Sequence, residues 1–414
     1  MPRSAPKERT ILVGVVPKGL PRPVAEDHLD ELERLVDTAG GEVVGRFLKE
    51  RVAPDPKTYI GKGSVAEIGA AARAGKARLV VFDDELSAGQ MRNLEEAWGE
   101  SVRVLDRPGL ILDVFALHAR SREARTQVEL AQLQYLLPRL AGRYGHLSGL
   151  GGGIGGRGGA GEQKLELDRR KIRDRITRLR RDLQKIEVAR LVRRRGRRRY
   201  VQVAIAGYTN AGKTTLFNRL TRESAYAVDR LFATLDARAA RAASPRLSEV
   251  IFVDTVGFVR KLPTTLVASF RSTLSEIRDA DLVLHVIDAA SERSDEEERV
   301  AAETFEELGV SPDRVLAVWN KADLAGRGAG RFGGLRVSAQ TGEGIERLEA
   351  EILRRIHPEA EEFRVRIPYT SARAIAAARA SFRVIDEQDR GDSLVMRLAG
   401  ERRHLSPIQR FVEG

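Results

Sequence analysis

The feature that most constrains this sequence is a glycine-rich loop between an apolar strand and a helical segment. Residues 201–205, VQVAI, are typical of a buried strand, and residues 207–214 follow the pattern G-x-x-x-x-G-K-T before the helical residues 216–220. Glycines let such a loop wrap phosphates, while backbone N–H groups and the helix N-terminus supply positive potential. The pattern predicts a phosphate-binding loop in an α/β domain.

The side chains of this loop have expected roles in binding a nucleoside triphosphate. Lys213 is expected to reach the β- and γ-phosphates, and the Thr214 hydroxyl to bind Mg²⁺. The other loop residues expected to contact the nucleotide are Gly207, Tyr208, Thr209, Asn210, Ala211, Gly212 and Thr215.

Two further motifs follow along the chain, each at the end of an apolar strand. In D-x-x-G at residues 254–257, Asp254 is expected to hold Mg²⁺ through water, and the Gly257 amide to contact the γ-phosphate. In N-K-x-D at residues 320–323, the Asp323 carboxylate accepts from guanine N1–H and the 2-amino group. Adenine lacks this pair of donors and would leave the carboxylate unpaired. The motifs predict selectivity for GTP and GDP.

The remaining predicted contacts come from the same segments and from the next strand. Ser338 and Ala339 are expected to complete the base pocket. The full set of expected contacts beyond the first loop, apart from the metal-binding threonine loop, is Asp254, Thr255, Val256, Gly257, Asn320, Lys321, Ala322, Asp323, Ser338 and Ala339.

A loop before Asp254 must supply a threonine to the metal if the order–disorder switch of GTPases operates here. Our candidate is Thr234, in the segment LFATL at residues 231–235, with Thr221 and Thr209 as less well placed alternatives. Phe232 and Ala233 are expected beside the nucleotide. The predicted Mg²⁺ ligands are thus Thr214, Thr234 and Asp254, and the predicted catalytic residues are Lys213, Thr234 and Gly257.

The residue directly after D-x-x-G predicts slow hydrolysis. Phe258 stands where a water-orienting glutamine is common, and an apolar ring cannot orient the attacking water. A partner, another residue or a cation must then complete the site. Asn210 is similar to the asparagine that helps bind K⁺ in some potassium-activated GTPases; the alternative role for a loop asparagine is to cap its own backbone.

The chain before the first motif has two different patterns. Residues 10–106 alternate short β-branched runs with helical patterns, which predicts a small α/β layer with parallel strands. Residues 121–140 and 165–191 are helical instead, and the second helix carries an apolar heptad seam of Leu165, Ile172, Ile176, Leu179, Leu183 and Ile186. Ten of the seventeen residues 145–161 are glycine, so we expect an antiparallel hairpin with a glycine tip. The alternative for the tip is an inert linker.

The net charge of +12 is concentrated in the second of these helices and its exit. Residues 164–199 contain 17 Lys or Arg and 5 Asp or Glu, a difference of +12. Such a block attracts phosphate backbones. The alternative interpretation is a solvated helix face.

Several classes of protein are disfavoured by composition. The 414 residues include no cysteine, which excludes disulfides, thiolate metal sites and cysteine nucleophiles. A run of about 18 apolar residues that could span a bilayer is lacking, and residues 1–10 do not look like a secretory signal. We therefore expect a cytoplasmic protein without a membrane span, and a monomer.

The motifs together resemble the HflX family of ribosome-associated GTPases over residues 10–358. The segments that carry the resemblance are YIGKG at 59–63, FDDELS at 82–87, DVFALHAR at 113–120, ELAQLQY at 129–135, GGIG at 152–155 before LELDR at 165–169, FATLD at 232–236 and DTVGF at 254–258. The resemblance implies a GTPase that binds the large ribosomal subunit and its RNA and splits stalled or idle ribosomes, with the hairpin directed towards the peptidyl-transferase region. It also supports Thr214 and Thr234 as Mg²⁺ ligands.

The expected fold class is a P-loop GTPase domain preceded by an α/β domain with a long helical hairpin and followed by a small α+β domain. The expected divisions are residues 1–120, the hairpin 121–199, the GTPase domain 200–358 and the appendage 359–414. Two other functions stay open: a GTP-dependent partner of an RNA-modifying enzyme, and a regulatory switch with no RNA role. The task of the appendage is not predicted.

Overall fold

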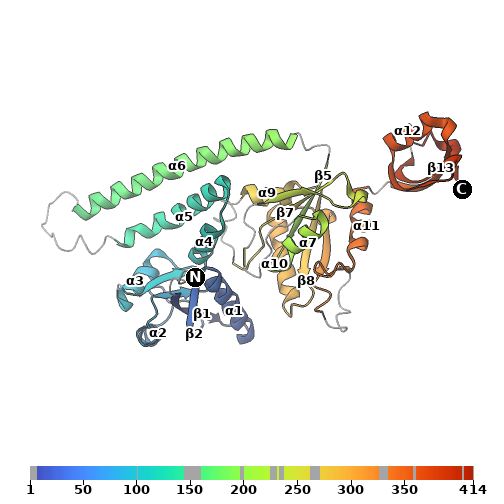
Figure 1. Ribbon diagram of the computed structural model, residues 1–414. Helices are drawn as coiled ribbons and strands as arrows, with labels where there is room; N and C mark the ends of the chain where they lie inside the picture. The colour runs from blue at the N-terminus through green and yellow to red at the C-terminus, as the bar shows by residue number, and fades with distance from the viewer. Residues whose placement is uncertain are drawn as a thin grey trace, which may run out of the picture.

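The computed structural model describes most of the chain, which is drawn from blue to red in Figure 1. The described ranges are residues 7–99, 101–143, 160–195, 200–223, 231–232, 237–261, 271–325, 334–357, 360–402 and 405–413. Among them, no helix has the length and apolar character needed to cross a membrane.

The first part of the chain folds into a parallel four-stranded sheet in the order β2-β1-β3-β4, as the alternating pattern predicts. Parallel sheets need cover on both faces. Leu29, Leu32 and Leu35 of α1 pack on one face, and Ile68 and Trp98 of α2 and α3 belong to the core on the other. The elements are β1 (Glu8–Pro17), α1 (Arg22–Thr38), β2 (Gly41–Arg51), α2 (Lys62–Gly75), β3 (Leu79–Phe82), α3 (Ala88–Trp98), β4 (Arg103–Asp106) and α4 (Arg107–His118).

Local side-chain caps fix where two of these helices begin. Ser87 and Gln90 form a reciprocal capping box at the start of α3, with Oγ accepting from Gln90 N at 3.2 Å and Gln90 Oε1 accepting from Ser87 N at 2.9 Å. Asp106 Oδ1 accepts from Gly109 N at 2.9 Å at the start of α4. Because Asp106 is also the last residue of the edge strand β4, the chain passes directly from this strand into α4. Helix α4 is followed by the two long helices of the hairpin.

The helices α5 (Arg122–Arg143) and α6 (Ala160–Arg195) lie side by side and project from the rest of the molecule (Figure 1). Ile176 and Leu179 are buried against Leu130, and Ile172 and Leu183 are partly buried beside them, as the heptad seam predicts. Of the other two seam positions, Ile186 is half-buried, and the side chain of Leu165 is not among those that the structure describes. The glycine tip also lies outside the described residues, but α6 begins at Ala160, so the prediction that residues 160–161 are non-helical is wrong.

The central domain contains the predicted nucleotide motifs on a six-stranded sheet in the order β10-β9-β8-β5-β7-β6. All neighbouring strands are parallel except β6, which pairs antiparallel with β7. The helices α7 and α11 share a core with one face of this sheet through Phe217 and Ile352. The elements are β5 (Val201–Gly207), α7 (Lys213–Thr221), β6 (Arg238–Arg241), β7 (Val250–Asp254), α9 (Arg271–Asp279), β8 (Leu282–Asp288), α10 (Ser294–Glu307), β9 (Val315–Asn320), β10 (Leu335–Arg336) and α11 (Ile345–Ile356).

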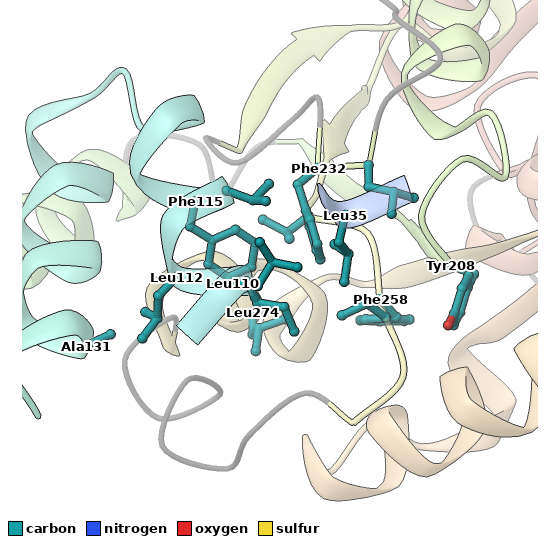
Figure 2. Packing of buried hydrophobic residues seen from close by; sticks show 14 of the residues in the cluster. Leu35, Leu110, Leu112, Phe115, Ala131, Tyr208, Phe232, Phe258 and Leu274 are labelled. Atoms are coloured by element: carbon teal, nitrogen blue, oxygen red, sulfur yellow. The ribbon is translucent and has the colours of Figure 1, made fainter. Parts of the chain in front are cut away.

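A shared apolar core joins this domain to the N-terminal one (Figure 2). Leu35, Leu110 and Phe115 come from the N-terminal domain, while Phe232 and Phe258 come from the segments around the predicted switch regions. The rings of Phe115 and Phe232 meet edge to face with centroids 4.6 Å apart. The two domains therefore pack through a buried interface.

The last segment forms an antiparallel sheet in the order β12-β13-β11-β14, with α12 contributing Ala374 and Ala378 to its core. The expected small α+β domain is present, with β12, in the polar segment RVIDEQD, at one edge of its sheet and the short strand β14 at the other. The fold class predicted from the sequence is confirmed. The elements are β11 (Ala360–Pro368), α12 (Ala372–Ser381), β12 (Arg383–Asp389), β13 (Ser393–Glu401) and β14 (Val412–Glu413).

Candidate nucleotide-binding site

The glycine-rich loop joins the end of β5 to the start of α7. Two of its glycines have a backbone conformation with positive φ and leave no room for a Cβ atom. Gly207 has φ +145°, and a Cβ there would lie 2.2 Å from the Val286 carbonyl oxygen. Gly212 has φ +88°, and a Cβ there would lie 2.2 Å from Asn320 Nδ2. Any other residue would push the loop away from its neighbours. The loop therefore keeps the shape that phosphate binding needs.

Lys213 lies at the first position of α7, which begins three residues before the predicted helical segment, and its side chain folds back along the loop. Its Nζ donates to the Tyr208 carbonyl at 2.6 Å. Burial lowers the pKa of Lys213 to about 8, and the nearby Asp254 opposes that shift. The negative charge of bound phosphates would stabilise the protonated amine.

The predicted metal ligands that the structure describes lie together. Thr214 Oγ1 donates to Asp254 Oδ2 at 2.9 Å, and Asp254 is fully buried at the end of β7. A hydroxyl and a carboxylate oxygen beside a phosphate loop suit Mg²⁺, which is commonly held by one or two protein oxygens with phosphates and water. The donor set therefore fits the ion, with the nucleotide supplying the other oxygens.

The third predicted ligand, Thr234, lies outside the described residues, as does Ala233. Phe232, two positions earlier, is described, and its ring packs in the interdomain core. The alternative Thr221 is less suitable because its hydroxyl donates to the Phe217 carbonyl at 2.7 Å at the far end of α7. The hydroxyl of the other alternative, Thr209, is buried within the loop. The roles of Thr234 and Phe232 at the nucleotide stay predictions.

The D-x-x-G segment lies across the phosphate loop. Phe258 N donates to the Gly207 carbonyl at 3.0 Å, and Thr209 N donates to the Phe258 carbonyl at 2.8 Å. A Cβ on Gly257 would lie 2.8 Å from Lys213 Nζ and 2.8 Å from Thr209 Cγ2, so only glycine fits there. This contact brings the Gly257 backbone beside the lysine expected to bind the γ-phosphate.

The Phe258 ring points into the protein. It is 3% exposed and meets the Phe305 ring edge to face, with centroids 5.5 Å apart. The ring therefore packs in the core, which agrees with the expectation that it does not orient water. Thr255 and Val256 are structural as well: the Thr255 hydroxyl donates to the Ile205 carbonyl at 2.8 Å, and Val256 joins the apolar core.

Asn320 connects the base motifs to the phosphate loop. Its Nδ2 donates to the Ala211 carbonyl and its Oδ1 accepts from Ala339 N, both at 2.9 Å. Ala322 N donates to the Val337 carbonyl at 3.1 Å, which joins N-K-x-D to the strand before Ser338. Asp323 is exposed, so its carboxylate is accessible to a base. The two predicted parts of the base pocket are thus adjacent.

Two supporting residues were not identified from the sequence. Asp288, at the end of β8, forms an ion pair with Lys321 at 2.6 Å. Arg219 of α7 donates to the Ala339 carbonyl at 3.0 Å and so supports the loop of the base pocket. An acidic residue at the end of a strand beside the predicted site was an available signal for Asp288; nothing in the spacing pointed to Arg219.

Asn210 and Thr215 are two further residues of the predicted phosphate loop. Asn210 is exposed and adopts a left-handed backbone with φ +64°, a conformation that asparagine tolerates. Thr215 lies in the first turn of α7. A K⁺ contact by Asn210 stays a prediction.

Comparisons with known proteins identify the family of the chain. Three family models match: "GTP-binding GTPase N-terminal" at residues 26–116, "GTP-binding GTPase Middle Region" at 118–197 and "50S ribosome-binding GTPase" at 202–321. A GTP-binding protein of Sulfolobus solfataricus, solved with GDP, is 25% identical with a TM-score of 0.43, covering 84% of this chain and 98% of that one.

Two other relatives are more similar to this chain in sequence than the Sulfolobus protein is. GTPase HflX of Caldanaerobacter subterraneus subsp. tengcongensis is 44% identical over 92% of this chain and 88% of the relative. GTPase HflX of Escherichia coli K12 is 42% identical over 83% of this chain and 82% of the relative. The chain therefore belongs to the HflX family of GTPases, and it is a GTP-hydrolysing enzyme.

Proposed function

We propose that this GTPase binds the large ribosomal subunit in its GTP form and splits stalled or idle ribosomes in the cytoplasm. The observation that carries the proposal is the basic helix α6, which α5 supports along an apolar seam. One matching family model is described as a 50S ribosome-binding GTPase, which supports the choice of partner. In this proposal the hairpin, residues 121–199, contacts ribosomal RNA.

The charge on α6 is available to a partner. Arg170, Arg178 and Arg181 are exposed, and none forms an ion pair with any residue in the described parts of the chain. By helical periodicity Arg170 and Arg181 lie on the side opposite the Ile176–Leu179 seam. A solvated face needs no such concentration of one sign of charge, so phosphate recognition explains the helix better.

The nucleotide site times this binding in our proposal. Thr214, Asp254 and Thr234 hold Mg²⁺, and Asn210 contributes to a K⁺ site. When bound, Mg²⁺ neutralises charge on the phosphates. Lys213 and the Gly257 amide hold the terminal phosphate, and Asp323 with Ser338 and Ala339 selects guanine. Residues 200–358 then act as the GTPase domain and residues 1–120 as the domain packed against it.

Cosedimentation with isolated large subunits tests the proposal. We expect binding with a non-hydrolysable GTP analogue, weaker binding with GDP, and a steep fall as salt rises. Each phosphate contact contributes a slope of about 0.7 to 0.9 in log affinity against log salt. Replacing Arg170, Arg178 and Arg181 by alanine should lower affinity and slope together. A control that removes as many charges from other surfaces replaces Arg73, Arg299 and Arg347.

If the two triple variants bound large subunits equally well, the proposal that the hairpin contacts ribosomal RNA would be contradicted. Absence of nucleotide-dependent binding by the wild-type chain would return the choice to a partner of an RNA-modifying enzyme or to a switch with no RNA role.

A further inference from the structure

A buried polar cluster connects the N-terminal domain to the phosphate loop and to the segment after D-x-x-G. We call it the Glu31 cluster; its members are Glu31, Asp83, Arg107, Tyr208, Arg260 and Lys261. Glu31, Asp83 and Arg107 belong to the N-terminal domain, and the other members belong to the GTPase domain. Apart from Lys261, all of them are buried.

Glu31 of α1 is the centre of this cluster. Its carboxylate accepts from the Tyr208 hydroxyl at 2.5 Å and from Arg107 Nη1 at 2.8 Å. The backbone N–H of Arg260 donates to the Tyr208 hydroxyl oxygen at 2.9 Å and to Glu31 Oε1 at 3.3 Å. Burial and the Glu31 carboxylate raise the pKa of Tyr208, so its hydroxyl stays protonated and donates. Glu31 thus contacts a phosphate-loop side chain and the backbone beyond Gly257.

A second carboxylate extends the same contact. Asp83 accepts from Lys261 Nζ at 2.6 Å and from Arg107 Nε at 3.0 Å. Burial raises the pKa of Asp83, but Arg107 and Lys261 outweigh it and lower the pKa below its usual value. Lys261 also reaches Asp84. Residues 260 and 261 are therefore held by carboxylates of the N-terminal domain.

Apolar contacts of the two residues before Arg260 support the cluster. Phe258 and Val259 are buried in the interdomain core, and Phe232, two positions before Thr234 in the sequence, packs on Phe115 of α4. The described residues of both segments expected to respond to the γ-phosphate thus pack against the same domain.

These contacts have a consequence for Gly257. Its amide is expected to contact the γ-phosphate, and it lies between Asp254, which is fixed at the end of β7, and the anchored residue Arg260. Buried charged hydrogen bonds are costly to break because each group left behind is desolvated and unpaired. The hydrogen bonds of Phe258 to Gly207 and Thr209 hold one side of the Gly257 amide against the phosphate loop, and the Glu31 contacts to Arg260 fix where the segment goes next.

We infer that Glu31 is a positioning residue for the nucleotide site, which holds Tyr208 and the Arg260 backbone so that the Gly257 amide meets the terminal phosphate of GTP. GDP lacks that phosphate, so in this inference Glu31 strengthens the binding of GTP more than that of GDP. The inference rests on the GTPase activity of the family and not on ribosome binding.

The test compares affinities for GDP and for a non-hydrolysable GTP analogue on the full-length chain without ribosomes. The variants are Glu31→Gln, Tyr208→Phe and the double variant. Glutamine at position 31 replaces one carboxylate oxygen by an N–H₂ group. That group then faces a donor, either Arg107 or the Tyr208 hydroxyl and Arg260 N–H. Tyr208→Phe removes one hydroxyl and keeps the ring. The matched control is Glu33→Gln, on the same helix, where Glu33 contacts only the exposed Arg46 in the described structure.

We expect Glu31→Gln and Tyr208→Phe each to weaken GTP-analogue binding roughly tenfold, the scale of one buried charged hydrogen bond, and to change GDP binding by less than about twofold. The double variant should be little worse than the stronger single variant, because both act on one contact. Turnover at saturating GTP should fall in parallel, and Glu33→Gln should resemble wild type.

Equal losses for GTP analogue and GDP, together with a lowered melting temperature, would show that Glu31 acts only in stability and would overturn the inference. Unchanged affinities in both variants would overturn it as well. Either result would leave ribosome binding untouched, because no ribosome enters the measurement.

Discussion

Asp323 is the residue on which guanine recognition depends. It is exposed beside the Asn320 and Ala339 contact, where a base edge can reach it. Asp323→Asn replaces one of two acceptors by a donor that opposes guanine N1–H. We expect GTP affinity to fall roughly 10- to 100-fold and xanthosine triphosphate binding to improve. Titration with both nucleotides measures the change; an unchanged GTP affinity would refute the base-pocket assignment.

Thr214 is the residue that best tests the metal site. Its hydroxyl contacts the buried Asp254 carboxylate at 2.9 Å. Mg²⁺ is expected to increase the affinity of the wild-type chain for a GTP analogue. Thr214→Ala removes one ligand and should lower the affinity measured with Mg²⁺ by about tenfold or more. Thr221→Ala is a matched control, because that hydroxyl donates within α7 to the Phe217 carbonyl. A magnesium titration in which the two variants respond alike would contradict the assignment.

The residues that the sequence identified are those whose signals are local. Lys213, Thr214 and Asp254 each follow a strand within a short motif, and the structure brings them together. The contact between Glu31 and Tyr208 carries no such signal, because this hydrogen bond joins residues 177 positions apart in the chain. Periodicity identified the apolar face of α1, but it does not say which domain a polar residue beside that face will meet.

Among the helices and strands, the hairpin makes a clear prediction about stability. Leu179 is 3% exposed in the seam with Leu130, while Leu167 on the same helix is 58% exposed. Leu179→Ala should destabilise the seam by about 2 to 4 kcal/mol, since it leaves a cavity. Hydrogen exchange should then quicken in α5 and α6 but not in β5 or β8. If Leu167→Ala increased hydrogen exchange in α5 and α6 as much as Leu179→Ala does, the assignment of the seam would be wrong.

Helices and strands with a clear pattern of apolar residues could be predicted from the sequence, and polar strands at the edge of a sheet could not. The parallel strands β1, β3 and β4 follow runs of β-branched and other apolar residues, and α6 follows its heptads. The strand β12 was missed because Arg383–Asp389 is mostly polar and lies at the edge of its sheet. An edge strand covered on few sides needs little apolar pattern, so its sequence resembles that of a loop.

For the whole molecule, slow basal hydrolysis is expected because the position after D-x-x-G holds Phe258, whose apolar ring is buried against Phe305 and cannot orient water. We expect low turnover by the free chain in sodium, higher turnover in potassium, and a further increase with large ribosomal subunits. Phosphate release measured under these conditions checks the expectation. Fast turnover by the free chain in sodium alone would contradict it.

The division of labour between hairpin and GTPase domain is the central claim. We propose that the hairpin and its glycine tip deliver ribosome splitting while the GTPase domain times it. Deleting residues 149–159, which lie outside the described parts of the chain, removes the tip and leaves the described nucleotide-site residues unaltered.

Light scattering of intact ribosomes mixed with GTP tests this claim most directly, with wild-type and tip-deleted chains compared at equal GTP occupancy. We predict that the wild-type chain splits ribosomes with GTP and not with GDP, and that the deletion variant binds GTP with nearly wild-type affinity yet leaves the ribosomes intact. Full splitting by the deletion variant would contradict the claim, because the tip would then be only a linker.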